Sequence, residues 1–312
     1  MGGHLSKIAE TVFNLLPRKL QQFARGRLAA GTNFKETATP CGLSLPSPVH
    51  ATLTPEEVGD GRVIVVGDVH GCPLELEALL DKCKFQQGVD KLVSVGDLVN
   101  KGEQSAEAVH LVRQHGGITV RGNHDEMALE RYEMWKKCGR LDPKYAYLEQ
   151  FSAEDVEYFR QMPFSLSIPS HGVLVVHAGI VPGTPLEDHL LHDLIEMRHV
   201  AAEGSASANR YKALPKFPRS AGQPWANIYN GPQHVIFGHH ARRRLQPCRY
   251  ATGIDTGCVL GDQLTAVVLP PVSELRRRGI ASPPTGSVTL ESIAGELISV
   301  RAKRCYKKED VD

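Results

Sequence analysis

Short apolar runs rich in β-branched residues alternate along the chain with stretches of helical periodicity. Residues 63–66, 92–95 and 118–120 are three such runs, and each is followed by a polar motif that starts with or near glycine and then by a helical pattern. Short apolar runs bounded by turn residues indicate buried strands, and apolar spacings of three and four indicate helices. We therefore predict three strand–turn–helix units of an α/β domain.

Further apolar runs extend this pattern towards the C-terminus. Residues 172–176 and 234–237 precede histidine-containing motifs, and residues 264–269 and 297–302 complete the series of predicted strands. Residues 136–169 have helical stretches rich in tyrosine and phenylalanine, which we interpret as a cap or an outlying part of the core. No internal repeat interrupts the alternation, so the pattern predicts one continuous catalytic domain.

The three glycine motifs carry side chains of types that bind metal ions. The motifs are Gly67-Asp68-Val69-His70-Gly71, Gly96-Asp97-Leu98-Val99-Asn100-Lys101-Gly102 and Gly122-Asn123-His124-Asp125. Neighbouring strands of one sheet deliver their carboxyl ends to the same edge, so we expect the polar side chains of these motifs to meet in one pocket. The expected members of the pocket are Asp68, His70, Asp97, Asn123 and His124.

This set of side chains favours divalent first-row metals. Carboxylate, imidazole and amide oxygen without thiolate suit Mn, Fe or Zn, and the carboxylate of Asp97 in the middle motif can bridge two ions. One such motif alone is also typical of an ordinary capped turn, whereas three at similar spacing favour a metal site. His177 and His239 follow later strands, and we predict that they are further ligands rather than structural histidines.

Composition and charge narrow the classes of function. The chain has 312 residues, enough for one large α/β domain, and its 36 basic and 35 acidic residues nearly balance. This balance excludes a nucleic-acid binder that works through a large net positive charge. The seven cysteines include no C-x-x-C pair, which favours free thiols in a reducing compartment. No apolar run is long enough to span a bilayer.

The N-terminal residues 1–28 differ in character from the rest of the chain. They combine apolar residues at helical spacing with five basic residues and one acidic residue, which is the pattern of a basic amphipathic helix. The first six residues also match the pattern for N-myristoylation, with Gly2 as the acceptor. An acyl chain and a basic helix together anchor a protein stably to a membrane surface. Packing on the catalytic domain and a mitochondrial transit peptide are the alternatives.

The remaining segments divide the chain further. Residues 29–61 are rich in Pro, Ser, Thr and Gly without periodicity, which predicts a linker. The catalytic domain is expected at residues 62–302, with a basic surface loop at residues 270–289, and residues 303–312 form a charged tail. We expect a cytoplasmic protein that associates with a membrane surface through its acylated helix, with a mitochondrial location as the alternative.

Five ordered motifs resemble the phosphoprotein phosphatase superfamily of calcineurin-like metallophosphoesterases. Besides the three glycine motifs, they are His177-Ala178-Gly179 and Gly238-His239. Cys72, Asn100-Lys101 and the sequence Gly253-Ile254-Asp255-Thr256-Gly257-Cys258 are most similar to its diadenosine tetraphosphatase-like (ApaH-like) branch. The resemblance covers about residues 63–269, and it implies a four-layer α/β/β/α sandwich with a two-metal site.

The resemblance also implies roles for individual residues. The implied metal ligands are Asp68, His70, Asp97, Asn123, His177 and His239. Asp97 would bridge two divalent ions, drawn from Mn, Fe, Zn, Co and Mg, and His124 would be the general acid that protonates the leaving oxygen. The implied phosphate-binding residues are Lys101, Arg198 and Asn123.

The chain departs from the Ser/Thr protein phosphatases at two positions of the second motif. Those enzymes have Asp and Arg where this chain has Asn100 and Lys101. That Asp orients the catalytic histidine, so either Asn100 or Asp125 is expected to do so here, and we place Asp125 with His124 in the catalytic group. Lysine contacts phosphate through one ammonium group, whereas arginine can donate two parallel hydrogen bonds. We therefore expect phosphate to be held more loosely.

The predicted function is a metal-dependent phosphatase that hydrolyses phosphoanhydrides. Dinucleoside polyphosphates, capped RNA ends and inorganic polyphosphate all contain a P–O–P chain, and the sequence leaves the three open. The arginines at residues 242–244 could hold an extended polyanion or form a solvated loop. The alternatives are a Ser/Thr protein phosphatase with the same site and an inactive scaffold that recruits partners to membranes through residues 1–28.

Overall fold

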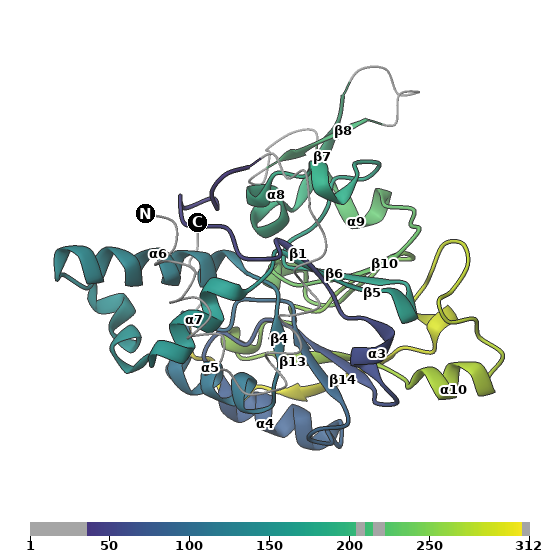
Figure 1. Cartoon of the computed structure of the whole chain (residues 1–312), viewed down its shortest axis with the longest axis horizontal. Helices are drawn as coiled ribbons and strands as arrows, with labels where there is room; N and C mark the ends of the chain where they lie inside the picture. The colour runs from purple at the N-terminus through teal and green to yellow at the C-terminus, as the bar shows by residue number, and fades with distance from the viewer. Residues whose placement is uncertain (1–35, 204–209, 215–221, 308–312) are drawn as a thin grey trace, which may run out of the picture. The chain divides into compact units, whose positions relative to one another are not determined.

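The computed structural model describes residues 36–203, 210–214 and 222–307. The predictions for residues 1–28, including the amphipathic helix and the acylation of Gly2, lie outside these residues. In the part of the chain that is described, two large β-sheets and the helices on their outer faces form stacked layers (Figure 1). The way the strands run in these layers decides where the polar strand ends meet.

The five-stranded sheet contains the strands that precede the glycine motifs. Its order is β14-β13-β2-β3-β4. The bounds of its strands are β2 (Val63–Val66), β3 (Lys91–Ser94), β4 (Ile118–Thr119), β13 (Gln263–Leu269) and β14 (Glu296–Arg301). Strands β2, β3 and β4 are parallel neighbours, so the prediction that the three motifs leave one sheet edge is confirmed. Every residue of β2 is buried, which explains its unbroken apolar sequence.

The six-stranded sheet carries the two later histidine motifs. Its order is β1-β5-β6-β10-β12-β11. The bounds of its strands are β1 (His50–Thr52), β5 (Ser165–Ile168), β6 (Val173–Val176), β10 (His234–Phe237), β11 (Gln246–Pro247) and β12 (Ala251–Gly253). Strands β6 and β10 are parallel neighbours, and so are β10 and β12. The motifs that follow β6 and β10 therefore leave this sheet side by side.

Helices cover the outer faces of both sheets. Their bounds are α3 (Pro55–Val58), α4 (Pro73–Lys82), α5 (Ser105–Gln114), α6 (Asn123–Cys138), α7 (Ala153–Gln161), α8 (Leu191–Glu196), α9 (Trp225–Ile228) and α10 (Val272–Arg277). Apolar residues of α4, α5, α6 and α7 form one core cluster with β2, β3 and β13. Helices α8 and α9 lie beyond the six-stranded sheet (Figure 1). The predicted α/β/β/α sandwich is confirmed.

Short 3-10 segments connect several of these elements. Their bounds are η1 (Pro143–Gln150), η2 (Pro169–His171), η3 (Leu186–Asp188), η5 (Ala241–Arg243), η6 (Cys258–Leu260) and η7 (Glu291–Ile293). The aromatic residues predicted to form a cap lie in η1 and α7, and several of them join the core cluster. Residues 143–161 therefore form part of the core, which was one of the two interpretations, whereas residues 165–168 of the same stretch form strand β5.

Two segments differ from what the sequence predicted. The stretch 29–61, expected to be a linker, contains β1 and α3, since β1 pairs in register with β5 and a capping box of Thr54 and Glu57 starts α3. The expected surface loop 270–289 contains α10, which buries Leu275. Both elements are short, and both are stabilised by contacts with distant parts of the chain that local sequence patterns do not reveal.

A further small sheet occupies the insertion between the two histidine motifs. Its order is β8-β7-β9, with bounds β7 (His199–Ala202), β8 (Tyr211–Leu214) and β9 (Gln223–Pro224). All seven cysteines are free thiols, and Cys72 and Cys258 are buried in the core cluster. Among the described residues, none of the helices has both the length and the apolar character needed to cross a membrane.

Candidate metal centre

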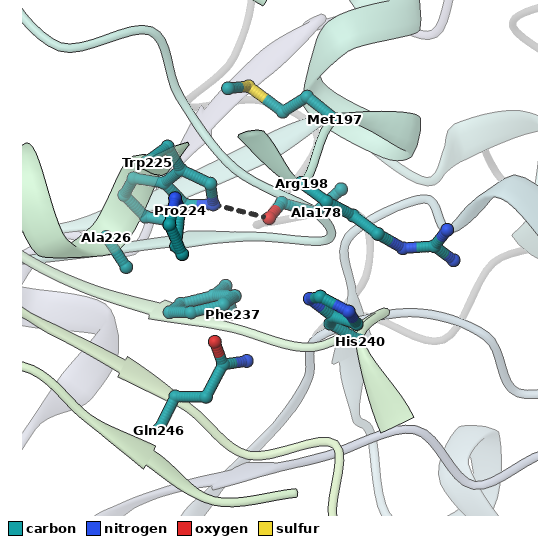
Figure 2. A pocket seen from close by; sticks show the side chains of 9 residues that line it. All are labelled: Ala178, Met197, Arg198, Pro224, Trp225, Ala226, Phe237, His240 and Gln246. Atoms are coloured by element: carbon teal, nitrogen blue, oxygen red, sulfur yellow. Dashed lines mark hydrogen bonds between the residues drawn. The ribbon is translucent and has the colours of Figure 1, made fainter. Parts of the chain in front are cut away.

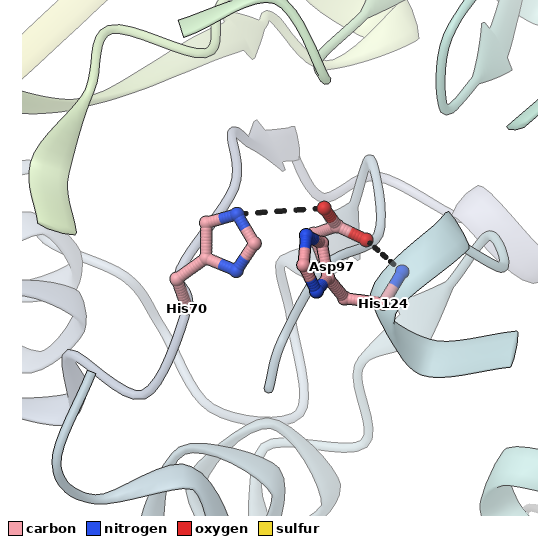
Figure 3. Close-up of side chains that lie close together, drawn as sticks. All are labelled: His70, Asp97 and His124. Carbon is pink, nitrogen blue, oxygen red and sulfur yellow. Dashed lines mark hydrogen bonds and ion pairs between the residues drawn. The ribbon is translucent and has the colours of Figure 1, made fainter. Parts of the chain in front are cut away.

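The polar motifs of both sheets converge on one buried site. Asp68 and His70 follow β2, Asp97 follows β3, and Asn123 and His124 form the first turn of α6 after β4. The six-stranded sheet adds His177 after β6 and His239 after β10. Figure 3 shows the carboxylate of Asp97 between the ring of His70 and the backbone of His124. The residues that the sequence predicted as metal ligands therefore lie together.

Asp97 is at the centre of this arrangement. Its Oδ2 lies 3.4 Å from Nε2 of His70, and its Oδ1 lies 3.5 Å from Nε2 of His177. Oδ1 also accepts a hydrogen bond of 2.9 Å from the backbone N–H of His124. The side chain is only 2 % exposed. One carboxylate thus presents an oxygen to each of two imidazoles, as a ligand that bridges two cations would.

The tautomers of these two histidines test whether the site fits metal ions. Nδ1 of His70 lies 2.9 Å from the carbonyl oxygen of Val99, and Nδ1 of His177 lies 2.9 Å from that of Val95. A carbonyl oxygen only accepts, so each Nδ1 carries the proton and each Nε2 presents a lone pair. These lone pairs face the carboxylate of Asp97, which is also an acceptor. Acceptors that face one another in a buried site are the donor set of a cation.

A second group of polar side chains lies beside the first. Oδ1 of Asn123 is 3.0 Å from Nε2 of His177 and 3.1 Å from Nδ1 of His239. The carboxylate of Asp68 accepts the backbone N–H of His239 at 3.1 Å and 3.2 Å, and its Oδ2 is 4.0 Å from Nε2 of His70. These contacts connect the two sheets, and they place two overlapping ligand sets on either side of Asp97.

The backbone around the site is held in sparsely populated conformations. Of the eight described non-glycine residues with positive φ, five belong to the site motifs. They are His70, Asp97, Asn100, Lys101 and His239, with φ between 45° and 69°. Such residues cost of order 1–3 kcal/mol each and persist where the surrounding structure fixes them. These backbone conformations set the direction of the site side chains at the ends of the strands.

Burial and like charges disfavour ionised groups at this site. Burial raises the pKa of Asp97 to about 7, and burial followed by the charges of Asp255 and Asp97 raises the pKa of Asp68. Burial also lowers the pKa of His70, and the nearby Lys101 ammonium lowers it further. A bound cation reverses this cost, because it favours ionised carboxylates and neutral imidazoles.

Lys101 reaches into the same site from its surface position. Its Nζ donates a hydrogen bond of 2.7 Å to Nε2 of His70, so its positive charge lies among the acceptors. The sequence predicted a phosphate-binding role for this residue. The structure places its ammonium beside His70, and the phosphate-binding role stays a prediction.

His124 and Asp125 occupy different positions relative to the metal ligands. The ring of His124 packs edge-on against His70, with centroids 5.0 Å apart. The carboxylate of Asp125 is buried and accepts the backbone N–H groups of Asp97 at 2.7 Å, Leu98 at 3.0 Å and Gly122 at 3.1 Å. Asp125 therefore holds two motif loops together. Of the two residues expected to orient His124, Asn100 is the one whose side chain lies beside the His124 ring.

A small pocket adjoins the centre on the side of the six-stranded sheet. Its lining residues are Ala178, Met197, Arg198, Pro224, Trp225, Ala226, Phe237, His240 and Gln246. Figure 2 shows Arg198 and His240 at one end and the rings of Trp225 and Phe237 at the other. Nε1 of Trp225 donates to the carbonyl oxygen of Ala178 at 3.0 Å. Arg198, predicted as a second phosphate clamp, is thus half-buried at the edge of the site.

Two site residues were not identified from the sequence. Asp255 follows β12, is buried, and its charge acts on the pKa of both Asp68 and Asp97. Tyr147 in η1 donates from its hydroxyl to Oδ1 of Asn100 at 2.8 Å. A glycine turn after an apolar strand was a usable signal for Asp255. No local pattern marks Tyr147, which reaches the site only through the packing of η1.

A family comparison agrees with this geometry. The model of the calcineurin-like phosphoesterase family matches residues 61–243, which is more than half of the chain and includes all the proposed metal ligands. The match begins at the first strand of the five-stranded sheet and ends just beyond the histidine motif that follows β10. Members of this family use a dinuclear site of divalent metal ions.

Individual proteins of known name are also similar to the chain. The bis(5'-nucleosyl)-tetraphosphatase PrpE [asymmetrical] of Halalkalibacterium halodurans is 28% identical, and the alignment covers 67% of this chain and 90% of the relative. The symmetrical bis(5'-nucleosyl)-tetraphosphatase of Thioalkalivibrio sulfidiphilus is 27% identical, over 65% of this chain and 93% of the relative. A crystal structure provisionally described as a diadenosine tetraphosphatase is 35% identical, covers 81% of this chain and 97% of its own, and superposes with a TM-score of 0.65.

Proposed function

Since the chain belongs to the calcineurin-like phosphoesterase family and is a metal-dependent phosphatase, we propose that it hydrolyses the P–O–P bonds of dinucleoside polyphosphates. The observation that carries the proposal is the Asp97 carboxylate, which lies between two imidazole lone pairs. The substrate class rests on the relatives named as bis(5'-nucleosyl)-tetraphosphatases, which align over about nine-tenths of their own length.

We assign the metal ligands from the two overlapping acceptor sets. Asp68, His70 and Asp97 would hold one ion. Asp97 would also hold the second ion, together with a group of three ligands: Asn123, His177 and His239. The hydrogen bonds of His70 and His177 to backbone carbonyls support this assignment, because they fix Nε2 as the ligand atom in each ring.

The remaining residues act on the substrate. When bound, two divalent ions supply positive charge that polarises the phosphoryl group and a nucleophile that is available at neutral pH. Lys101 and Arg198 bind phosphate oxygens, Lys101 through its ammonium group and Arg198 through the paired N–H groups of its planar guanidinium. His124 hydrogen-bonds the leaving oxygen. Asp125 is a positioning residue, because its carboxylate holds the backbone of Asp97 in place.

The substrate test is a turnover panel with purified full-length protein. After treatment with a chelator, the protein is reloaded separately with Mn, Mg, Zn and Co. Each form is given diadenosine tetraphosphate, capped RNA, inorganic polyphosphate and a phosphopeptide at equal concentration. We expect diadenosine tetraphosphate to be the fastest substrate. Water adds across one anhydride bond, so two ADP molecules indicate symmetrical cleavage and ATP with AMP indicates asymmetrical cleavage.

The panel also separates the competing functions. Faster turnover of the phosphopeptide overturns the proposal in favour of a protein phosphatase. If capped RNA or polyphosphate is cleaved fastest, that compound replaces dinucleoside polyphosphates as the proposed substrate. Asp97→Asn should abolish hydrolysis and reduce metal binding. The control is Asp60→Asn, which makes the same chemical change at an exposed residue outside the site motifs. An inactive scaffold would show no metal-dependent turnover in any form.

A membrane contact through residues 1–28 is a separate proposal from the sequence. Its test is fractionation of cells that express the full chain or the Gly2→Ala variant. If acylation of Gly2 anchors the protein, the variant shifts from the membrane fraction to the soluble fraction. Equal fractionation of both proteins contradicts the lipid anchor, and import of both into mitochondria supports the transit peptide.

A further inference from the structure

The side-chain amide of Asn100 lies between a tyrosine and the histidine next to the metal centre. The hydroxyl of Tyr147 donates a hydrogen bond of 2.8 Å to Oδ1 of Asn100. On the other side, Nδ2 of Asn100 is 3.2 Å from Nδ1 of His124 and 3.4 Å from the backbone carbonyl oxygen of His124. Asn100 is only 3 % exposed, so its amide has a fixed set of partners.

These partners determine the orientation of the Asn100 side-chain amide, that is, which side its oxygen and its NH2 group face. A backbone carbonyl oxygen only accepts hydrogen bonds, so the amide atom that faces the His124 carbonyl is the NH2 group. The Tyr147 hydroxyl donates to the opposite atom, which agrees with this orientation. The backbone N–H of Asn100 is held by the Ser105 hydroxyl at 3.0 Å, which fixes the main chain of the same residue.

The orientation of the amide decides the tautomer of His124. Because the NH2 group of Asn100 donates towards Nδ1 of His124, that nitrogen accepts and carries no proton. The single ring proton is then on Nε2. A carboxylate at position 100 would do the opposite, because it accepts from Nδ1–H and stabilises a ring that carries protons on both nitrogens.

We propose that Tyr147 and Asn100 hold His124 with Nδ1 as an acceptor and its proton on Nε2, and thereby restrict the site to leaving groups that need little protonation. Hydrolysis of a phosphoanhydride expels a phosphate oxygen, which leaves as a stable anion and needs only a hydrogen bond. Hydrolysis of an alkyl monoester expels an alkoxide, which must receive a full proton from the acid. The pair therefore selects anhydrides over monoesters of serine or threonine. This inference rests on the proposed function, since it assigns leaving-group choice at the same site.

The first test measures how the rate depends on the leaving group. Wild-type protein and Asn100→Asp, which has nearly the same shape, are compared on a series of aryl phosphates of decreasing leaving-group acidity and on diadenosine tetraphosphate. We expect the wild-type kcat to fall steeply along the series. In Asn100→Asp, the rate on the poorest leaving group, relative to diadenosine tetraphosphate, should rise about tenfold or more, in line with typical gains from general acid catalysis.

Matched variants separate this effect from loss of structure. Tyr147→Phe removes only the hydroxyl that anchors the amide, and we expect a smaller change of slope in the same direction. Asn100→Ala removes the amide that holds Nδ1 of His124, so it should change the slope in the same direction as Tyr147→Phe and by at least as much. A residue that merely supports the fold would lower all rates by one factor. Parallel series for wild type, Asn100→Asp and Tyr147→Phe overturn the inference.

A spectroscopic measurement tests the tautomer without any variant at position 100. The wild-type protein is labelled with ¹⁵N-histidine and loaded with Mg²⁺ or Zn²⁺, and His124 is assigned by comparison with His124→Gln. We expect Nδ1 to resonate as an unprotonated nitrogen and Nε2 as a protonated one, and the reverse assignment overturns the inference. A wild-type protein that fails to cleave diadenosine tetraphosphate but shows the Nε2–H tautomer refutes the proposed substrate alone.

Discussion

Glycine at position 238 leaves the space that the carboxylate of Asp68 fills. A Cβ at this position would lie 2.0 Å from Oδ1 of Asp68 and 2.6 Å from Cγ2 of Val95. Asp68 would have to move, and a displacement of about 1 Å in a catalytic site can cost about 10²-fold in rate. We therefore expect Gly238→Ala to lower kcat for diadenosine tetraphosphate about 10²-fold, as measured by steady-state kinetics.

A second glycine provides the control for this prediction. Gly139 ends α6 with a φ of 72°, and an added Cβ would meet no atom within 4 Å. Gly139→Ala should lower the free energy of unfolding by about 1–2 kcal/mol, because alanine is disfavoured in the left-handed region. Its kcat should equal that of wild type. Wild-type kcat in Gly238→Ala would show that the site tolerates movement of Asp68.

The Lys101 side chain provides a prediction about substrate binding. Its ammonium contacts Nε2 of His70, so it lies where it can reach a phosphate oxygen at the centre. Lys101→Met keeps most of the stem and removes the charge. Loss of a charged hydrogen bond costs about 1.5–3 kcal/mol, so we expect kcat/KM for diadenosine tetraphosphate to fall about 10–100-fold.

Lys84 is a matched control for Lys101. Both lysines have positive φ, 67° for Lys101 and 52° for Lys84, and both are exposed. Lys84→Met therefore reproduces the change in charge and the backbone strain away from the site motifs. If both variants lower kcat/KM equally, the effect comes from net charge and not from a phosphate contact at position 101.

At the scale of single residues, the sequence indicated which residues are of metal-ligand type, but it did not indicate their hydrogen-bond partners. Asp68, His70 and Asp97 were predictable because they lie in glycine motifs at the ends of apolar runs. Their hydrogen bonds were not predictable. The contact between Tyr147 and Asn100 spans 47 positions, and it depends on how η1 packs against the second glycine motif. Partners of this kind follow from tertiary packing, which no local pattern encodes.

At the scale of elements, the buried strands were the most predictable part of the fold. β2, β6 and β10 are buried on both faces, so β2 and β6 are continuously apolar and β10 is apolar after His234. β1 has only three residues, and its position is fixed by pairing with β5, about 115 positions away. α3 is a single capped turn. Elements of this length carry too few residues to show a period.

Helix α7 provides a prediction about how elements are joined. Asp155 near its start accepts from the backbone N–H of Ser152 at 2.8 Å, and its carboxylate also pairs with Arg113 and His110 of α5. The residue thus caps α7 and links it to α5. We expect Asp155→Asn to lower the free energy of unfolding by about 1–2 kcal/mol at pH 7, as measured by urea denaturation.

The pH dependence of this difference has a definite sign. Burial raises the pKa of Asp155, but hydrogen bonds from Ser152, Arg113 and His110 outweigh burial and lower the pKa below its ordinary value. A carboxyl group with a lowered folded-state pKa stabilises the fold above its unfolded pKa of about 3.9, and this stability is lost as the pH falls through the folded value. The wild-type advantage over Asp155→Asn should therefore be constant between pH 7 and about 5 and shrink below about 4. A constant difference at low pH would show that the charge of Asp155 contributes nothing.

At the scale of the whole molecule, the metal centre joins the two large sheets. The five-stranded sheet supplies Asp68, His70 and Asp97, and the six-stranded sheet supplies His177 and His239. Direct hydrogen bonds already connect the two groups, from the backbone of His239 to Asp68 and from the ring of His177 to the carbonyl of Val95. The loops of each sheet are therefore ordered partly by the other.

This arrangement predicts that metal ions stabilise both sheets together. Burial raises the pKa of Asp68 and of Asp97, and the charge of Asp255 raises both further, so removal of a cation leaves unfavourable repulsion inside the fold. Ions that bind only the folded state add about 2.7 kcal/mol of stability at a concentration of 100 times Kd. We expect EDTA to lower Tm, and we expect Asp97→Asn to have a Tm that responds much less to EDTA. Hydrogen exchange should show protection gained on metal loading at the ends of β2 and β3 and equally at the ends of β6 and β10. Protection confined to the five-stranded sheet would mean that His177 and His239 do not bind the ions, and the ligand assignment across the two sheets would then be wrong.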